Sequence, residues 1–306
     1  MNMQAQRFGV EIEFTGITRG DAAGVVAEHF GTSVVYSGAG YDARKVADGQ
    51  GRIWKVMSDS SIRAQRKEGG RRVSAGSGFK CELVTPILSY EDIETLQEIV
   101  RKLRGAGAIA NASCGIHIHV DAAPHTAKTL RNLMNIVASK EDMLYRALGV
   151  NDSRIHYCKK ADKEVLGRVN AAKPSEMRRL EEIWYGTRNV ERHHCHYDDS
   201  RYHGVNLHAT FTKGTVEFRL FNAASDTGNL HAGKIKAYVQ LCLAISHQAL
   251  TQRSAQYRPT ATDNEKYAMR CWLLRLGMIG DEFKTARHHL LKRLEGDSAW
   301  RHGRAA

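Results

Sequence analysis

Three pairs of ionisable residues, each two positions apart, lie in otherwise apolar segments of the chain. They are Glu11 and Glu13 in FGVEIEF, His117 and His119 in CGIHIHV, and Glu217 and Arg219 in TVEFRLF. Residues two apart in a β-strand point to the same face of a sheet. Each segment therefore predicts a strand with two reactive side chains on one face and apolar residues on the other. Three such strands indicate a sheet face that forms a working site.

The carboxylates favour a divalent cation. Two ionised carboxylates held side by side repel each other unless a positive charge lies between them. Carboxylate oxygens are hard ligands that suit Mg²⁺, with Mn²⁺ as an alternative. Glu82, in the strand-like segment KCELVTPI, needs a partner or a cation if it is buried. It is therefore a candidate third carboxylate.

The histidine and arginine pairs leave two kinds of chemistry open. His117 and His119 are compatible with a zinc site, although HIHVDAAPH has no glutamate at the spacing of cupins and lies late for the first strand of an amidohydrolase barrel. Glu217 and Arg219 could form a simple ion pair. However, an arginine beside carboxylates and a histidine favours metal-assisted phosphoryl transfer, because its planar fork matches phosphate oxygens. The chain has no Walker A sequence, dinucleotide fingerprint or kinase motif set.

Composition narrows the class of protein. The 306 residues, 42% hydrophobic and 25% charged, are enough for a sizeable core. Six scattered cysteines without a CxxC motif favour reduced thiols. The N-terminal segment lacks the apolar core of a signal peptide, and the longest nearly apolar run, 235–245, is too short to span a bilayer. We expect a soluble cytoplasmic protein with no membrane partner.

The net charge of +12 suits anionic partners such as an acidic polymer or nucleic acid, and a solvated basic surface is the alternative. The excess is concentrated in the segment 63–80. Its basic residues are Arg63, Arg66, Lys67, Arg71, Arg72 and Lys80, against the single acid Glu68. Four glycines in the same segment predict a mobile basic loop.

The hydrophobic pattern predicts an α+β fold with a curved, largely antiparallel sheet backed by helices. Strands are expected at 7–14, 33–36, 52–57, 80–85, 114–120, 204–209 and 214–221. Helices are expected from Asp21 to before Gly31 and from a capping-box-like start at Ser89 and Asp92 to Gly105. Further helices are expected at 126–148 with a break at Ser139, 175–184, 229–251, 263–276 and 281–295. The short link between the last two strands indicates a hairpin. We expect one domain, 1–306, with a core at 7–222 and a helical C-terminal third at 223–306.

The order of these motifs resembles the amidoligase family. The segments that carry the resemblance are FGVEIEF, WKVMSDSSI, CELVTPIL, NASCGIHIHVD, SRIHYC, RYHGVNLHA and TVEFRLFNA, over about residues 8–222. The resemblance implies the fold of glutamine synthetase and γ-glutamylcysteine synthetase. It also implies an ATP-dependent carbon–nitrogen ligase that joins a carboxylate to an amine through an acyl phosphate, with ATP and metal ions on the concave face of the sheet.

The resemblance also assigns residue roles. It implies metal ligation by Glu11, Glu13, Glu82, His117 and Glu217, and nucleotide contacts by His119, Lys55, Trp54 and Arg219. Substrate contacts fall on Asp59, Ser60, Arg154, Tyr202 and Asn206, and the catalytic residues are Arg219, Glu13, Glu217 and Asp59. Ser60 and Ser61 stand where the family has Gly-Ser.

Several alternatives stay open at this stage. One is a zinc-dependent hydrolase built on the two histidines, and another is a catalytically inactive relative that binds a partner. The cluster His193, His194, Cys195 and His196 is expected to be a polar loop at the rim of the site. The basic segment 63–80 is a candidate site for an acidic polymer or nucleic acid. The ligase itself would take small-molecule or peptide carboxylates and amines.

Overall fold

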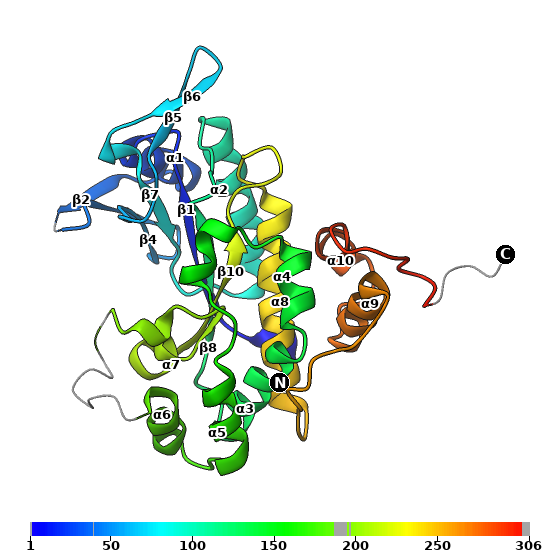
Figure 1. Ribbon diagram of the computed structural model, residues 1–306. Helices are drawn as coiled ribbons and strands as arrows, with labels where there is room; N and C mark the ends of the chain where they lie inside the picture. The colour runs from blue at the N-terminus through cyan, green and yellow to red at the C-terminus, as the bar shows by residue number, and fades with distance from the viewer. Residues whose placement is uncertain (1, 39, 187–194, 196, 302–306) are drawn as a thin grey trace.

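A computed structural model describes residues 2–38, 40–186, 195 and 197–301. Its centre is an eight-stranded sheet in the order β2-β3-β4-β7-β1-β8-β10-β9, in which every neighbouring pair is antiparallel (Figure 1). Its strands are β1 (Phe8–Phe14), β2 (Val34–Gly38), β3 (Ala43–Ala47), β4 (Ile53–Met57), β7 (Cys81–Val84), β8 (Gly115–Asp121), β9 (Val205–Asn206) and β10 (Thr215–Asn222). A separate hairpin consists of β5 (Gln65–Glu68) and β6 (Arg71–Ser74). The predicted α+β class with an antiparallel sheet is confirmed.

The α-helices lie between and after the strands. They are α1 (Arg19–Phe30), α2 (Ile93–Gly105), α3 (Ala127–Ala138), α4 (Glu141–Leu148), α5 (Lys163–Ala172), α6 (Met177–Tyr185), α7 (His208–Lys213), α8 (Ala232–Thr251), α9 (Glu265–Arg275) and α10 (Lys284–Leu291). Short 3-10 helices include η4 (Asp152–Tyr157) and η6 (Asp199–Arg201). Within the part of the chain that the structure describes, no helix has the length and hydrophobicity to cross a bilayer.

One face of the sheet packs against helices and forms the core. Val10 and Ile12 of β1 are at most 1% exposed, and both point away from the face that carries Glu11 and Glu13. Phe221 of β10 stacks on Tyr238 of α8 with ring centroids 4.4 Å apart. Burying each such side chain contributes about 1.5–3 kcal/mol. This core fixes which face each strand turns outward.

The segment 204–209 forms less strand than predicted. Only Val205 and Asn206 pair with β10, and the chain then enters α7. The Asn206 Oδ1 accepts a hydrogen bond from the Ala209 backbone N–H at 3.4 Å, at the start of that helix. Gly214 ends α7 with φ +72°, a left-handed conformation that glycine adopts readily. The predicted short hairpin link is therefore a helical turn.

The segment 63–80 is not an irregular loop. Its central residues form the β5–β6 hairpin, whose turn places Gly69 and Gly70 at φ +55° and +78°. Positive φ at both central residues is characteristic of two-residue hairpin turns. Besides this hairpin, β3 and α5 were not predicted, because their sequences carry charged residues and little periodicity.

Candidate active site

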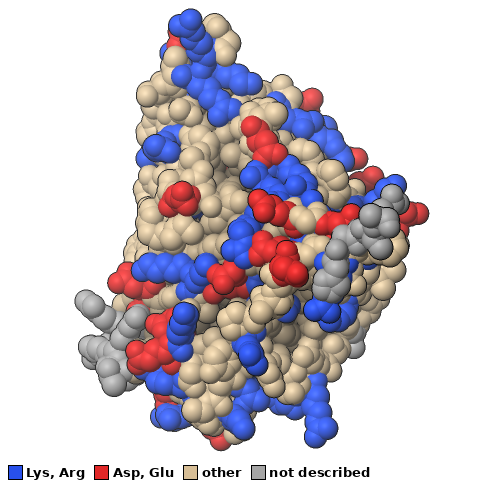
Figure 2. Space-filling view, turned by 45° about the vertical axis from the view of Figure 1, so that its right-hand side comes forward, with Lys and Arg blue, Asp and Glu red and all other residues tan. Residues whose placement is uncertain are grey.

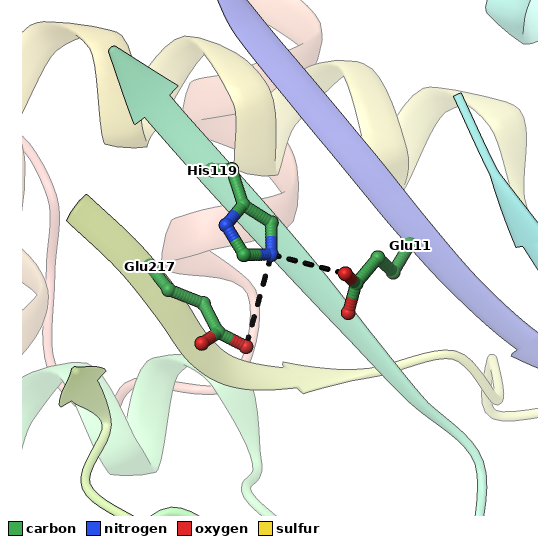
Figure 3. Close-up of side chains that lie close together, drawn as sticks. All are labelled: Glu11, His119 and Glu217. Carbon is green, nitrogen blue, oxygen red and sulfur yellow. Dashed lines mark ion pairs between the residues drawn. The ribbon is translucent and has the colours of Figure 1, made fainter. Parts of the chain in front are cut away.

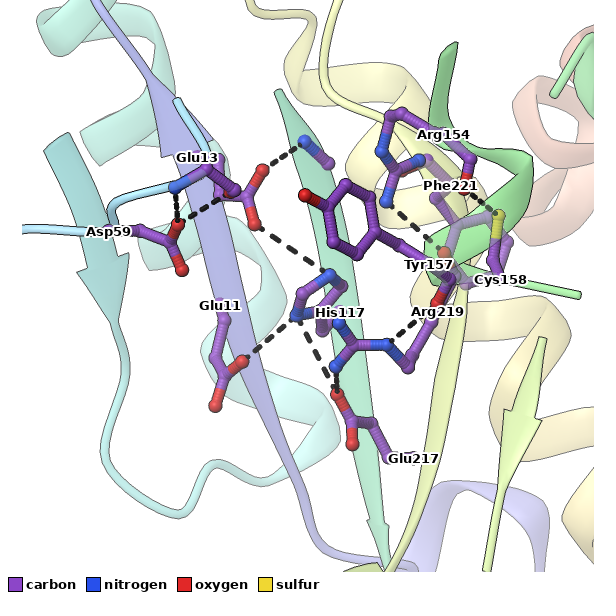
Figure 4. A network of polar contacts seen from close by, with 12 residues as sticks. Glu11, Glu13, Asp59, His117, Arg154, Tyr157, Cys158, Glu217, Arg219 and Phe221 are labelled. Carbon is purple, nitrogen blue, oxygen red and sulfur yellow. Dashed lines mark hydrogen bonds and ion pairs between the residues drawn. The ribbon is translucent and has the colours of Figure 1, made fainter. Parts of the chain in front are cut away.

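The sheet register brings six of the predicted site residues, all glutamates or histidines, onto one face. Glu11 of β1 lies opposite His117 of β8, and Glu13 lies opposite Glu82 of β7. Glu217 of β10 lies opposite His119 on one side and Asn206 on the other. Directly opposed residues in antiparallel strands share a face, so four strands contribute to one cluster (Figure 4).

His117 lies at the centre of this cluster. Its Nδ1 is 3.0 Å from the Glu11 Oε2 and 3.6 Å from the Glu217 Oε1. Its Nε2 is 3.8 Å from the Glu13 Oε1. One buried imidazole ring therefore lies beside three carboxylates, and Glu13 and Glu217 contact it from opposite sides (Figure 4).

His119 points its Nε2 between two carboxylates (Figure 3). This nitrogen lies 3.2 Å from the Glu11 Oε1 and 3.9 Å from the Glu217 Oε1, and it is buried without a well-oriented hydrogen bond. The Nδ1 is 2.8 Å from the Thr215 hydroxyl. Burial opposes protonation of His119, but the Glu11 and Glu217 charges raise its pKa. A cation could replace that proton, because a histidine fixed through one nitrogen presents the other to a metal.

Glu217 and Arg219 form a fixed ion pair. The Arg219 Nη1 donates to the Glu217 Oε1 at 2.5 Å, and the Asn206 Nδ2 donates to the other carboxylate oxygen at 2.6 Å. The Arg219 Nε donates to the Tyr157 carbonyl at 3.2 Å. Burial opposes ionisation of Glu217, but Arg219 and both histidines outweigh it and lower the pKa of Glu217 to about 2. The glutamate is therefore an anion at neutral pH.

Arg154, predicted to contact substrate, instead supports the backbone of β10. Its Nη1 donates to the Phe221 carbonyl at 2.7 Å and its Nη2 to the Arg219 carbonyl at 3.3 Å (Figure 4). These carbonyls lie where the pairing of β10 with β8 shifts register. A Cβ at Gly115 would come within 2.1 Å of the guanidinium. Arg154 is 3% exposed, so its role here is to hold the irregular strand that carries Arg219.

A second carboxylate group lies beside the first. Glu13, Glu82 and Asp59 each place an oxygen within 4.8 Å of the others. Burial, together with the charges of Glu11, Glu13 and Asp59, raises the pKa of Glu82 well above its usual range. Each ionised pair at such a distance costs about 3 kcal/mol at an effective dielectric constant of ~20. Glu13 offsets part of this by accepting from the Gly115 N–H at 2.6 Å, and Asp59 by accepting from the Ser61 N–H at 2.7 Å.

The donor set fits hard divalent cations. Three groups of side chains can each hold an ion: Glu11 with His119 and Glu217, Glu11 with Glu82 and His117, and Glu13 with Asp59 and Glu82. Neighbouring groups share Glu11 or Glu82. The repulsion within the carboxylate groups and the unsatisfied His119 Nε2 are both relieved by cations at these positions.

The two residues predicted from the WK dipeptide separate. Lys55 lies opposite Val84, which lies opposite Glu11, so its side chain is exposed on the same face as the acids. Trp54 is fully buried on the helix-covered face, where it packs near Phe30 and donates its indole N–H to Asp48 at 3.2 Å. A nucleotide on the acidic face cannot reach Trp54 from there, so the sequence-based assignment is corrected.

The remaining predicted residues line or support the rim. The Tyr202 ring lies 5.8 Å from the Tyr157 ring in an edge-to-face arrangement. Tyr157 points toward Glu13 and His117 (Figure 4). Ser60 is exposed, and its carbonyl accepts from the Lys80 ammonium at 2.8 Å. Asn206 orients Glu217 as described above. The His193–His196 cluster, apart from Cys195, lies outside the described residues.

The structure adds residues that the sequence did not indicate. Lys213 of α7 places its Nζ 3.8 Å from the Glu11 Oε1, and Thr215 orients His119. Both lie beside a cavity of about 340 Å³ that adjoins Glu11 and His119 and is also lined by Arg7, Val84, Pro86 and Ile87. Lys213 was missed because the helix that turns it toward Glu11 was read as a link between strands.

Comparison with known proteins places the chain in a family. Residues 4–246 match the family described as "Putative amidoligase enzyme", and the chain belongs to that family. The expected resemblance is thereby confirmed. No curated protein shows a significant match. Among solved structures, a bifunctional glutathione synthetase from Pasteurella multocida is similar at 12% identity and a TM-score of 0.39, over 95% of this chain and 47% of that protein. The chain thus spans about half the length of that enzyme.

Proposed function

We propose that the protein is an ATP-dependent carboxylate–amine ligase that forms an amide or peptide-like bond through an acyl phosphate. The observation that carries this proposal is the convergence of Glu11, Glu13, Glu82, His117 and Glu217 on one sheet face beside Arg219. Membership of the amidoligase family supports a ligase. We also propose that the sheet curves around this face as in glutamine synthetase.

The acidic face would hold two Mg²⁺ ions, or Mn²⁺ in their place. Glu13 and Glu82 would be ligands to one ion. Glu11 and Glu217, which both lie beside the His117 Nδ1, would hold the other ion together with that histidine. ATP would supply the phosphoryl group that makes the carboxylate reactive, and the metal ions would neutralise its phosphate charges. The protein contributes fixed ligands, because the Gly115 N–H holds Glu13 and the Asn206 amide holds Glu217 before any ligand arrives.

Arg219 would stabilise the transferring phosphoryl group. Its Nη1 is engaged by Glu217 and its Nε by the Tyr157 carbonyl, so the guanidinium plane is fixed in direction. Such prearranged charge stabilises a transition state without further reorganisation. Asp59, at the other end of the acidic cluster, would draw in the amine and accept its proton.

The cavity of about 340 Å³ beside Glu11 is the proposed nucleoside site. Its apolar wall includes Val84, Pro86 and Ile87, while His119 and Lys213 lie at its inner end toward the acids. Lys55 is exposed on the same face. This arrangement would place phosphates over the metal ligands and the base against the apolar wall.

A zinc-dependent hydrolase is the second candidate, because His119, Glu11 and Glu217 form a group that also suits Zn²⁺. Such an enzyme would act without a nucleotide. A catalytically inactive binding relative would neither join substrates with ATP nor hydrolyse amides. The nucleotide requirement therefore separates the three functions.

The test supplies the protein with ATP, Mg²⁺, pooled carboxylates and amines, and hydroxylamine as a small surrogate amine. We expect ADP and phosphate to form in step with amide or hydroxamate, identified by mass spectrometry. AMP and pyrophosphate would overturn the acyl-phosphate mechanism. Hydrolysis of amides without ATP would favour the zinc enzyme.

A further inference from the structure

A cavity of about 750 Å³ lies between the β5–β6 hairpin and two loops at the end of the sheet, around residues 110–112 and 224–228. Its hairpin wall is formed by Arg63, Gln65, Arg72 and Ser74. The opposite walls are formed by residues 110–112 and 224–228, whose polar residues are Asn111, Ser225, Asp226 and Thr227. No step of the proposed reaction uses this space.

The hairpin presents positive charge on the side that faces the cavity. Lys67 lies directly opposite Arg72, and Gln65 lies opposite Ser74, so these residues share a face. Arg63 lines the same cavity. Figure 2 shows Lys and Arg side chains gathered over the hairpin at the top of the molecule. Among the described residues, neither Arg63 nor Lys67 has an ion-pair partner.

The other face of the hairpin is different. Arg66 pairs with Glu68 at 3.1 Å, and Arg71 lies opposite the same glutamate in the register. This face therefore carries two arginines and one acid. The two faces offer matched pairs of cations, Arg63 with Lys67 and Arg66 with Arg71, whose neutralisation changes the net charge equally.

Arg72 fixes the hairpin against the body of the protein. Its guanidinium donates to the carbonyls of Ala110, Thr227 and Gly228, at 3.3, 3.3 and 2.9 Å. A side chain at position 228 would come within 2.1 Å of that guanidinium. The cationic face is therefore held in place over the cavity.

The one acid in the cavity wall is neutralised. Asp226 forms ion pairs with Lys292 at 2.5 Å, with Lys234 at 3.9 Å and with Arg293. Lys292 and its neighbours lower the pKa of Asp226. This side of the cavity thus carries more positive than negative charge, which suits a ligand with several negative groups.

The cavity adjoins the carboxylate end of the active site. The Asn111 Nδ2 donates to the Arg63 carbonyl at 2.8 Å, and four residues later the Gly115 N–H donates to Glu13. Four residues span at most about 14 Å. Arg63 is likewise four residues from Asp59. An extended peptide of about four or five residues would therefore reach from the cavity to the acidic cluster.

We propose that this cavity binds the acidic side chains of a peptide substrate whose reacting carboxylate enters the acidic cluster from the end at Glu13. This inference rests on the proposed ligase function and specifies its substrate class. A peptide with several carboxylates supplies both the anchoring charges and the group that is activated. Nucleic acid offers no carboxylate, and no aromatic side chain for base stacking lines the cavity.

The test measures binding of fluorescently labelled hexaglutamate, diglutamate and single-stranded oligothymidylate to the full chain, without nucleotide, at low and moderate salt. We expect hexaglutamate to bind at least about tenfold more tightly than diglutamate. The variant Arg63→Gln/Lys67→Gln should weaken hexaglutamate binding about three- to tenfold, as expected for two exposed ion pairs, and flatten its salt dependence. The control Arg66→Gln/Arg71→Gln should change it less than about twofold.

Several results would overturn the proposal. Equal weakening by both variants would show charge attraction without a site on one face. Tighter binding of oligothymidylate, lost in Arg63→Gln/Lys67→Gln, would assign the cavity to nucleic acid. If the rate of ligation depends neither on peptide length nor on the Arg63→Gln/Lys67→Gln change, the peptide site is rejected and the ligase function stands. Peptide binding that is retained without any ATP-dependent ligation would keep the binding site and reject the ligase function.

Discussion

Arg219 depends on geometry as well as charge. Its guanidinium contacts the Glu217 carboxylate and the Tyr157 carbonyl through different nitrogens, which a lysine ammonium cannot reproduce from one position. We predict that Arg219→Lys lowers kcat about 100-fold, the size of effect seen when one charge-stabilising donor is removed from a transition state. Initial rates of ATP-dependent hydroxamate formation would measure this loss.

The control for this variant is its fold. The Arg219→Lys protein should keep the melting temperature of the parent within a few degrees, because the positive charge beside Glu217 is retained. A well-folded Arg219→Lys variant with activity within about threefold of the parent would remove Arg219 from the catalytic residues.

Glu82 should destabilise the protein when no cation is bound. Burial and the charges of Glu11, Glu13 and Asp59 raise its pKa, so its ionisation in the folded state costs stability as the pH rises above the ordinary carboxyl value. We predict that Glu82→Gln raises the melting temperature in EDTA at pH 8 by about 3 °C or more, roughly 1 kcal/mol.

The same variant should respond less to metal. Mg²⁺ with an ATP analogue should raise the melting temperature of the parent clearly and that of Glu82→Gln by less than half as much, because a carboxylate ligand is gone. An identical gain in both proteins would place the metal ions away from Glu82.

At the scale of elements, alternation predicted the strands that carry the site. In β1, β8 and β10 the apolar residues lie against helices and the ionisable pairs face outward, as their spacing of two requires. Pairing between these strands could not be predicted, because register depends on contacts between distant segments. The opposition of Glu11 to His117 and of Glu217 to His119 therefore comes from the structure alone.

The errors occurred where tertiary contacts override local pattern. Trp54 and Lys55 are adjacent in the strand and therefore point to opposite faces of the sheet. Only the packing of α1 shows which of the two side chains faces the core. Arg154 lies in a short 3-10 helix whose guanidinium reaches backbone carbonyls of β10 more than sixty positions away. The neighbouring residues in the sequence therefore do not predict that Trp54 faces the core or that Arg154 binds the backbone of β10.

The junction of α3 and α8 should make stability pH-dependent. His125 lies with its Nε2 2.9 Å from the Ser246 hydroxyl and its Nδ1 3.1 Å from the Thr129 hydroxyl. Burial lowers the pKa of His125 to about 4, with Asp121 opposing that shift. The unfolded chain takes up the proton first as the pH falls, so this contribution is complete above about pH 6.5 and is lost toward pH 4.

We predict that the parent loses about 2 kcal/mol more unfolding free energy than His125→Gln between pH 7.5 and pH 5. Denaturant titrations of both proteins at the two pH values give the comparison. The difference isolates His125 from the other histidines. Parallel pH dependence in the two proteins would contradict the prediction.

For the whole molecule, β1 connects three regions. Phe8 to Glu11 line the cavity of about 340 Å³, Glu11 and Glu13 carry the acidic cluster, and Thr15 just beyond the strand contacts Gln65 of the hairpin. The proposed nucleotide site, the metal ligands and the proposed peptide site therefore follow one another along a single strand. The basic excess at the hairpin lies at the carboxylate-substrate end of this path.

The most direct test of the central claim is a crystal structure of the parent protein with Mn²⁺ and a non-hydrolysable ATP analogue. Anomalous scattering locates the manganese independently of any assumption about ligands. We predict two Mn²⁺ ions about 4 Å apart, held by Glu11, Glu13, Glu82, His117 and Glu217, with the nucleoside in the cavity beside Val84 and Ile87. Manganese bound away from these acids, or a nucleotide on the helix-covered face, would contradict the account.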